Sequence, residues 1–75
     1  MRRDIRIRGE TITLGQLLKL AGVIDSGADA KTLLRTQPVT VNGDPETRRG
    51  KKLTVDDVVQ VGELELHVTS ANIDG

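Results

Sequence analysis

The chain has 75 residues, no Phe, Trp, Tyr or Cys, and 11 basic and 11 acidic residues that give a net charge of zero. The lack of cysteine excludes disulfides, thiolate metal sites and thiol redox chemistry. No apolar run approaches the ~20 residues of a membrane span, and the polar N-terminal segment does not resemble a signal peptide. We therefore expect a cytoplasmic protein with one domain over residues 1–75, a core of Leu, Val, Ile and Ala, and a frayed end at 70–75.

Charge is unevenly distributed along the chain. Residues 1–52 hold all 11 Lys and Arg with six acids, a net charge of +5, whereas residues 53–75 hold the other five acids, a net charge of −5. Such asymmetry suggests a surface that faces nucleic acid. The alternative is that the two halves intermix in space and neutralise each other.

The first predicted elements are a strand and a helix. Residues 4–8 alternate Ile with Arg, which indicates a short strand at a sheet edge, where charge discourages aggregation. Thr13 and Gln16 are spaced as a capping box, so a helix is expected to begin here. Gly22 suits the left-handed residue that ends such a helix.

A second helix is expected to begin at a cap on Asp25 or Ser26 and to run to about Thr36. Pro38 prevents the helix from continuing and biases the preceding residue away from helical backbone. The apolar residues of this second helix follow helical spacing: Ala30, Leu33 and Leu34.

The remaining predicted elements are short strands. Residues 39–41 form an apolar strand that leads into Asn42-Gly43, a strong signal for a hairpin turn. Residues 58–61 and 64–68 give two more strands, separated near Gly62.

The loop after the hairpin is strongly basic. Arg48, Arg49, Lys51 and Lys52 place four cations within five positions. Arginine can bridge phosphate oxygens with its fork of donors, while lysine acts as a point charge. We interpret this loop as a phosphate-contacting segment; the alternative is a loop that is merely solvated.

The second helix offers weaker signals of the same kind. Lys31 and Arg35 are four residues apart and share a face, at a like-charge cost of about 0.2–0.5 kcal/mol, which suits a face that meets an anion or two solvated cations. The helix start near Ser26 presents free N–H groups, as every helix does. Single-strand binders usually stack bases on aromatic rings. Because this chain has none, we expect recognition of folded or double-helical RNA through backbone charge and shape.

No catalytic constellation is present. We expect His67 to be a solvated histidine on the strand face that also carries Glu63 and Glu65, and Asp56-Asp57 to form a turn. One histidine with scattered carboxylates does not make a metal site. Without a nucleophile, a second histidine or a glycine-rich phosphate loop, we predict no enzyme, no metal and no cofactor.

Six features occur in a characteristic order: LLKLAGV at 17–23, serine at 26, AKTLL at 30–34, VTVNG at 39–43, RRGKKL at 48–53 and DVVQV at 57–61. This order resembles the RNA-binding domain first defined in ribosomal protein S-four, the alpha-L motif, over about residues 12–61. Residues 11–20 and 46–53 look most like the stand-alone bacterial subgroup typified by YbcJ and YaaA.

The resemblance implies an α+β fold in which two short antiparallel helices pack on a small, mostly antiparallel sheet. It implies non-catalytic binding of structured RNA, ribosomal or transfer, with the ribosome as a candidate partner. It assigns RNA contacts to helix two and the basic loop: Ser26, Lys31, Arg35, Arg48, Arg49, Lys51 and Lys52.

Two departures from the family pattern bear on these contacts. Gly27-Ala28-Asp29 stand where the family usually has an early arginine, and Gln37 stands where it usually has glycine. The first departure removes a phosphate contact and adds a carboxylate. We therefore expect the loop to contribute more to RNA binding than helix two.

Other functions remain open from the sequence alone. A protein-interaction module on the same scaffold would use the acidic surface of residues 53–75. A ubiquitin-like sulfur carrier would end in Gly-Gly, whereas this chain ends in Asp74-Gly75. We expect a monomer that takes no small-molecule substrate and does not associate with membranes.

Overall fold

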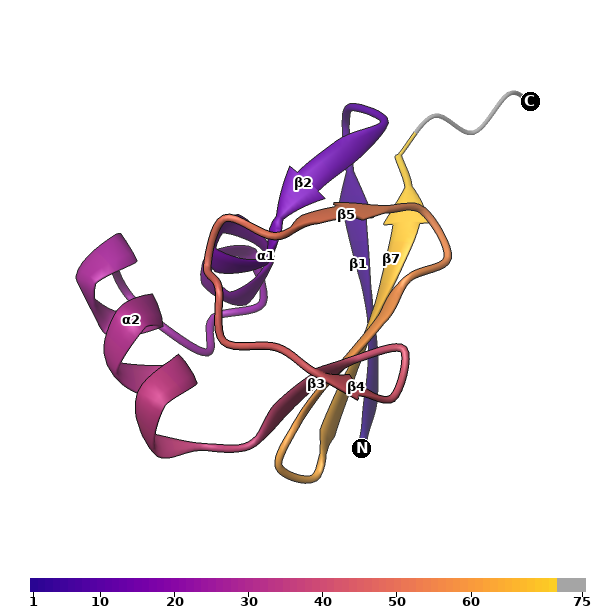
Figure 1. Ribbon diagram of the computed structural model, residues 1–75. Coiled ribbons are helices and arrows are strands. Elements are labelled where there is room, and N and C mark those ends of the chain that lie inside the picture. The colour runs from indigo at the N-terminus through magenta and orange to yellow at the C-terminus, as the bar shows by residue number, and fades with distance from the viewer. Residues whose placement is uncertain (72–75) are drawn as a thin grey trace.

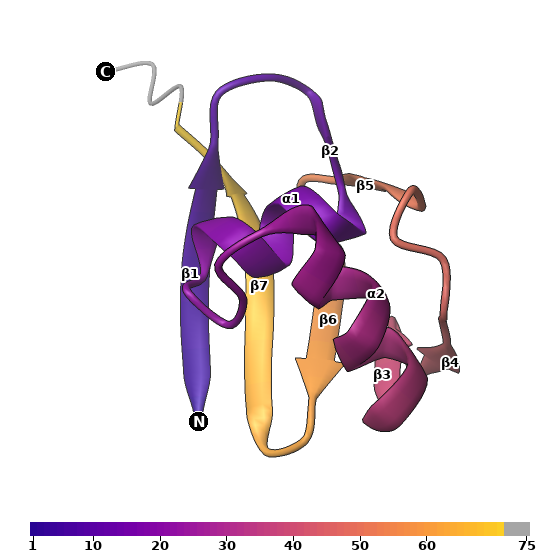
Figure 2. The same ribbon diagram turned by 90° about the vertical axis from the view of Figure 1, so that its left-hand side faces the viewer.

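The computed structural model describes residues 1–71. Along the chain the elements are β1 (Arg2–Ile7), β2 (Thr11–Thr13), α1 (Leu14–Leu20), α2 (Gly27–Thr36), β3 (Val39–Val41), β4 (Asp44–Pro45), β5 (Lys52–Thr54), β6 (Val58–Val61) and β7 (Leu64–Ser70). Both helices lie on one face of the main sheet (Figures 1 and 2). The predicted α+β class, with two helices and a mostly antiparallel sheet, is confirmed.

The main sheet has five strands in the order β1-β7-β6-β3-β4. Strand β1 lies at its edge, as expected, but it begins two residues earlier than predicted and pairs in parallel with β7, Ile5 opposite Val68. The other pairs in this sheet are antiparallel. Strands β2 and β5 form a separate antiparallel pair, with Ile12 opposite Leu53; the sequence reasoning did not anticipate this pair.

The core lies between the helices and the main sheet. Inward-facing strand residues alternate with outward-facing polar ones, as the period of two requires. Burying such aliphatic side chains contributes about 1.5–3 kcal/mol each. The largest fully buried side chains come from α1 and from strands β5, β6 and β7: Leu14, Leu17, Leu18, Leu53, Leu66, Val59 and Val68.

The ends of α1 match the predicted signals. The Thr13 hydroxyl accepts a hydrogen bond from the Gln16 backbone N–H, and the Gln16 side-chain oxygen accepts one from the Thr13 backbone N–H. The capping box therefore forms. At the other end Gly22 has φ +76°, its N–H donates to Lys19, and the next N–H donates to Leu18. This is the Schellman arrangement. The Arg3 guanidinium adds a 2.7 Å hydrogen bond to the Ala21 carbonyl.

Helix α2 begins at the predicted position but without the predicted side-chain cap. Ser26 is the N-cap residue, but its side chain makes no capping hydrogen bond, and Asp25 lies outside the helix. The predicted side-chain cap is therefore wrong, although the predicted position is right. Helix α2 ends at Thr36, as predicted, two residues before Pro38.

The predicted turns are present. Asn42 and Gly43 both have positive φ, +52° and +89°, as the hairpin turn of type I′ requires. The Asn42 side chain also joins two strands: its Oδ1 accepts from the Val58 N–H at 2.9 Å, and its Nδ2 donates to Asp57 at 3.0 Å. Asp56, with φ +82°, lies in the expected turn before β6.

The end of the described chain is better ordered than predicted. Ser70 belongs to β7 and is paired with Ile7, and the Ala71 N–H donates to the Ile7 carbonyl at 2.9 Å. The prediction of a frayed segment is wrong for these two residues, because the parallel partner β1 extends as far as Ile7. The rest of that segment, residues 72–75, lies outside the described residues.

Candidate nucleic-acid interface

The basic loop between β4 and β5 is held by its backbone against the start of α1. The Leu14 N–H donates to the Lys51 carbonyl at 2.8 Å, and the Gly15 N–H donates to the Arg49 carbonyl at 2.9 Å. A Cβ at position 15 would lie 3.4 Å from that Arg49 carbonyl oxygen, at van der Waals contact. The two backbone hydrogen bonds therefore hold the loop closely against the first turn of α1.

Arg49 connects the loop to α2. Its Nη1 donates to the Gly27 carbonyl at 3.2 Å, at the first residue of the helix. The guanidinium retains further N–H donors that can face solvent. The fold thus places an arginine of the loop beside the stretch of α2 that lacks an arginine of its own.

The predicted cations of α2, Lys31 and Arg35, follow Gly27 along the helix. Gly27, Lys31 and Arg35 are spaced by four residues, so they follow one line along the helix surface. Both cations are exposed. Asp29 is two residues from Gly27 and from Lys31, which places it about 200° around the axis. The carboxylate that weighed against helix two in the sequence thus lies on the opposite side of the helix.

Arg48 is already partnered. Its Nε lies 3.1 Å from Glu46 Oε2, which also accepts the Arg48 and Thr47 N–H groups. The Arg48 side chain is 75% exposed, whereas Glu46 is 12% exposed. The hydrogen bonds from Arg48 lower the pKa of Glu46, and Glu46 raises the pKa of Arg48. Arg48 can meet solvent, but its charge is partly neutralised.

The two lysines of the loop lie at a different surface from Arg49. Lys51, half-buried, and Lys52 line a hollow of about 230 Å³ together with three acids, Asp44, Glu46 and Asp57. The structure therefore divides the predicted quartet: Arg49 joins the helices, Arg48 pairs with Glu46, and the lysines lie among carboxylates.

Ser26 is exposed at the N-cap of α2, next to Gly27, the residue that Arg49 contacts. Since its hydroxyl makes no capping bond, it stays available to a ligand. Of the predicted residues, Ser26, Lys31, Arg35 and Arg49 gather at α2, while Arg48, Lys51 and Lys52 lie along the loop.

Sequence reasoning missed two residues of α1. Gln16 and Lys19 line a groove of about 350 Å³ with Arg49, Gly15 and Gly27. Both side chains are exposed. Their spacing of three residues matches any helix surface, so the sequence held no signal that would separate them from ordinary solvated residues.

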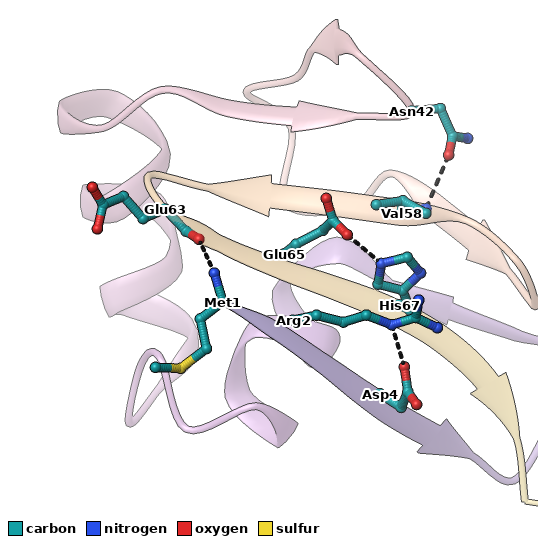
Figure 3. A network of polar contacts seen from close by, with 8 residues as sticks. All are labelled: Met1, Arg2, Asp4, Asn42, Val58, Glu63, Glu65 and His67. Carbon is teal, nitrogen blue, oxygen red and sulfur yellow. Dashed lines mark hydrogen bonds and ion pairs between the residues drawn. The ribbon is translucent and has the colours of Figure 1, made fainter.

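The opposite face of the sheet carries paired charges (Figure 3). Arg2 Nε lies 3.2 Å from Asp4 Oδ1 on β1, and His67 Nε2 lies 2.6 Å from Glu65 Oε2 on β7. The hydrogen bond with His67 lowers the pKa of Glu65. With 20% of its side chain exposed, His67 is a partnered, half-buried residue and not the solvated one that was predicted.

The acidic segment does not form one surface. Strand β7 lies between β1 and β6, so its Glu65 is opposite Arg2 in the register. Asp56 and Glu63 lie at opposite ends of β6, and Asp57 accepts hydrogen bonds from Thr54 and Asn42. The described part of this segment therefore intermixes with basic residues, the second of the two charge arrangements considered from the sequence.

Within residues 1–71, no group of three or more His, Cys, Asp or Glu side chains is arranged to hold a metal ion. Neither helix in that range has the length and apolar character needed to cross a membrane.

Comparison with known proteins adds two findings. A family model described as "S4 domain" matches residues 5–69. The chain is also 54% identical over 61 residues to a protein of Bacillus subtilis (strain 168) named "Probable ribosome maturation protein RlbA", an alignment that covers 81% of this chain and 86% of the relative.

Proposed function

Because the chain belongs to the S4 domain family, we propose that it binds structured RNA and catalyses no reaction on it. The RNA contacts are Arg49, Lys31 and Arg35 along α2 with Ser26 at its start, and Arg48, Lys51 and Lys52 along the loop. The name of the Bacillus relative favours ribosomal RNA and a role of the protein on the ribosome in the bacterial cytoplasm.

One observation carries the proposal: the 3.2 Å hydrogen bond between the Arg49 guanidinium and the Gly27 carbonyl. It aligns a loop arginine with Lys31 and Arg35, so one helix edge presents three cations. Side chains of this kind contact phosphates and position a nucleic acid without reading its sequence. The lack of aromatic residues agrees with recognition of shape and backbone.

The proposal is tested by measuring affinity for a folded ribosomal RNA hairpin over a salt series, beside an unstructured single strand of equal length. With four to six phosphates neutralised, log K should fall against log salt with a slope of about −3 to −5. The hairpin should bind more tightly than the single strand. A flat salt response, or preference for the single strand, would contradict the proposal.

The non-catalytic part is tested separately. The purified protein is incubated with the same hairpin, with and without Mg²⁺, and the RNA is examined for cleavage and for a change in mass. We expect neither, since the described side chains include no nucleophile with an adjacent base. RNA modification that is lost in a His67→Ala or Asp57→Asn variant would overturn this expectation.

A further inference from the structure

A second groove lies on the other side of α1, between this helix, the end of β1 and the segment that leads to β2. Its volume is about 760 Å³. Its lining combines three cations with small and apolar residues: Arg6, Ile7, Arg8, Gly9, Thr11, Ile12, Gln16, Lys19 and Leu20. None of the three cations was among the predicted RNA contacts.

This groove adjoins the one that Arg49 lines. Gln16 and Lys19 line both grooves, so the exposed side of α1 is their shared wall. Figure 2 shows α1 between β1 on one side and α2 on the other. A ligand that leaves Arg49 across α1 therefore passes Lys19 and then reaches Arg8.

The cations that line this second groove lack the side-chain partners that Arg3 and Arg48 have. Within residues 1–71, the side chains of Arg6, Arg8 and Lys19 make no ion pair or hydrogen bond. By contrast, Arg3 binds the Ala21 carbonyl and Arg48 binds Glu46. No carboxylate of that range lines either groove.

Unpaired cations along two adjoining grooves are suited to a phosphodiester chain. Each cation can contact a phosphate without first losing an intramolecular partner. Leu20, which is 60% exposed at the edge of the groove, adds an apolar surface for a ribose or a base. A protein segment would need acidic groups repeated along its length to match the same path.

We propose that the bound RNA extends from Arg49 across α1 into this second groove, with Lys19 and Arg8 as additional phosphate contacts. This inference rests on the proposed function and enlarges its interface from the loop and α2 to α1 and the end of β1. The chain then contacts RNA over two adjoining grooves.

The first test is a Gln16→Glu variant, which places a carboxylate on the wall shared by both grooves. Glutamate also satisfies the capping box with Thr13, so the helix should keep its stability. The matched control is Gln60→Glu, the same chemical change at an exposed position of β6 on the far sheet face. We expect affinity for the RNA hairpin to fall several-fold in the first variant and to remain unchanged in the control.

The second test is the double variant Arg8→Ala/Lys19→Ala. Two lost phosphate contacts should weaken binding by roughly tenfold at low salt and make the salt slope shallower by about two units. Arg2→Glu, which also lowers the net charge by two, is the control on the far face. Melting temperatures measured in parallel report on folding.

These variants separate the two proposals when they are compared with the loop variant, in which Arg48, Arg49, Lys51 and Lys52 are replaced by Ala. If the loop variant weakens binding and both groove variants bind as the parent does, the second groove is not an RNA contact and the inference is wrong. If the hairpin does not bind the parent protein at all, the proposed function itself fails.

Discussion

The two faces of the main sheet hold similar kinds of charged residues in different states. On the outer face Arg2 forms an ion pair with Asp4 and Glu65 forms a hydrogen bond with His67, so these side chains already have partners. On the helical face Lys19, Lys31 and Arg35 make no ion pair within residues 1–71. The difference teaches that a count of cations does not locate a binding surface. The available surface is the one where the cations have no carboxylate partner.

The largest expected effect comes from the basic loop between β4 and β5. Replacing Arg48, Arg49, Lys51 and Lys52 with Ala should weaken binding of the RNA hairpin by about 100-fold or more at low salt, because up to four phosphate contacts are lost. Binding isotherms at several salt concentrations provide the measurement. The pair Lys31→Ala/Arg35→Ala should cost less.

The outer face provides the control for this comparison. Arg2→Glu changes the charge by two where the side chain already pairs with Asp4, and it should leave affinity nearly unchanged. Equal losses in this control and in the loop variant would mean that total charge, and not one face, determines binding. If the Lys31→Ala/Arg35→Ala variant loses more affinity than the loop variant, the main RNA contact is on α2.

A second prediction compares two arginines of the loop, Arg49 without a carboxylate partner and Arg48 with one. Arg49→Ala should weaken hairpin binding by roughly tenfold, whereas Arg48→Ala should have a smaller effect because Glu46 already neutralises much of that charge. The measurement is the same affinity assay at low salt. The reverse order would show that the RNA displaces Glu46 and takes Arg48 as the stronger contact.

A third prediction concerns the stability of the helical face. Thr13→Ala removes the hydroxyl that caps α1, so the free energy of unfolding should fall by about 1 kcal/mol. Thr13→Ser retains the hydroxyl and should retain most of the stability. Urea titration followed by circular dichroism measures both variants. Equal stability of all three proteins would mean that the capping box contributes nothing.

The smallest predicted effect tests the outer face by pH. The hydrogen bond with His67 lowers the pKa of Glu65 from its ordinary value of 4.5. A carboxyl whose pKa is lower in the folded state stabilises the fold above its unfolded pKa and loses that contribution as the pH falls through the folded value. Stability should therefore decline below about pH 4.5.

The Glu65→Gln variant isolates this contribution. Its decline in stability with acid should be shallower than that of the parent, although not absent, because the pKa of Glu46 is lowered in the same way. Urea titrations between pH 7 and pH 3 give the comparison. RNA affinity at neutral pH should not change, since Glu65 is on the face away from the helices.

Local signals in the sequence predicted much of this fold. The Thr13 cap, the end of α1 at Gly22 and the Asn42-Gly43 turn each depend on neighbouring residues, and each is present. Pairings between distant segments were harder. Strands β2 and β5 have three residues each, too few to show a period, and nothing local indicates that Ile12 lies opposite Leu53.

The candidate site was predictable in composition but not in arrangement. Four cations adjacent in the sequence suggested one surface, yet local geometry sends Arg49 toward α2 and leaves Lys51 among acids. Lys19 gave no signal because the two grooves that it lines form only in the folded chain. Asp29 seemed close to Lys31 in the sequence, but the helical rotation separates them.

The parallel pairing of β1 with β7 has a consequence for how the chain acquires its structure. Ile5 and Ile7 precede both helices and five other strands along the chain, whereas the residues they pair with, Val68 and Ser70, follow all of these elements. Contacts between segments so far apart close slowly, because the entropy of a long loop is lost before the contact forms. Until β7 is complete, β1 has no strand to join. We therefore expect Ile5 and Ile7, which are buried in the folded protein, to stay accessible to other apolar surfaces until β7 has been synthesised.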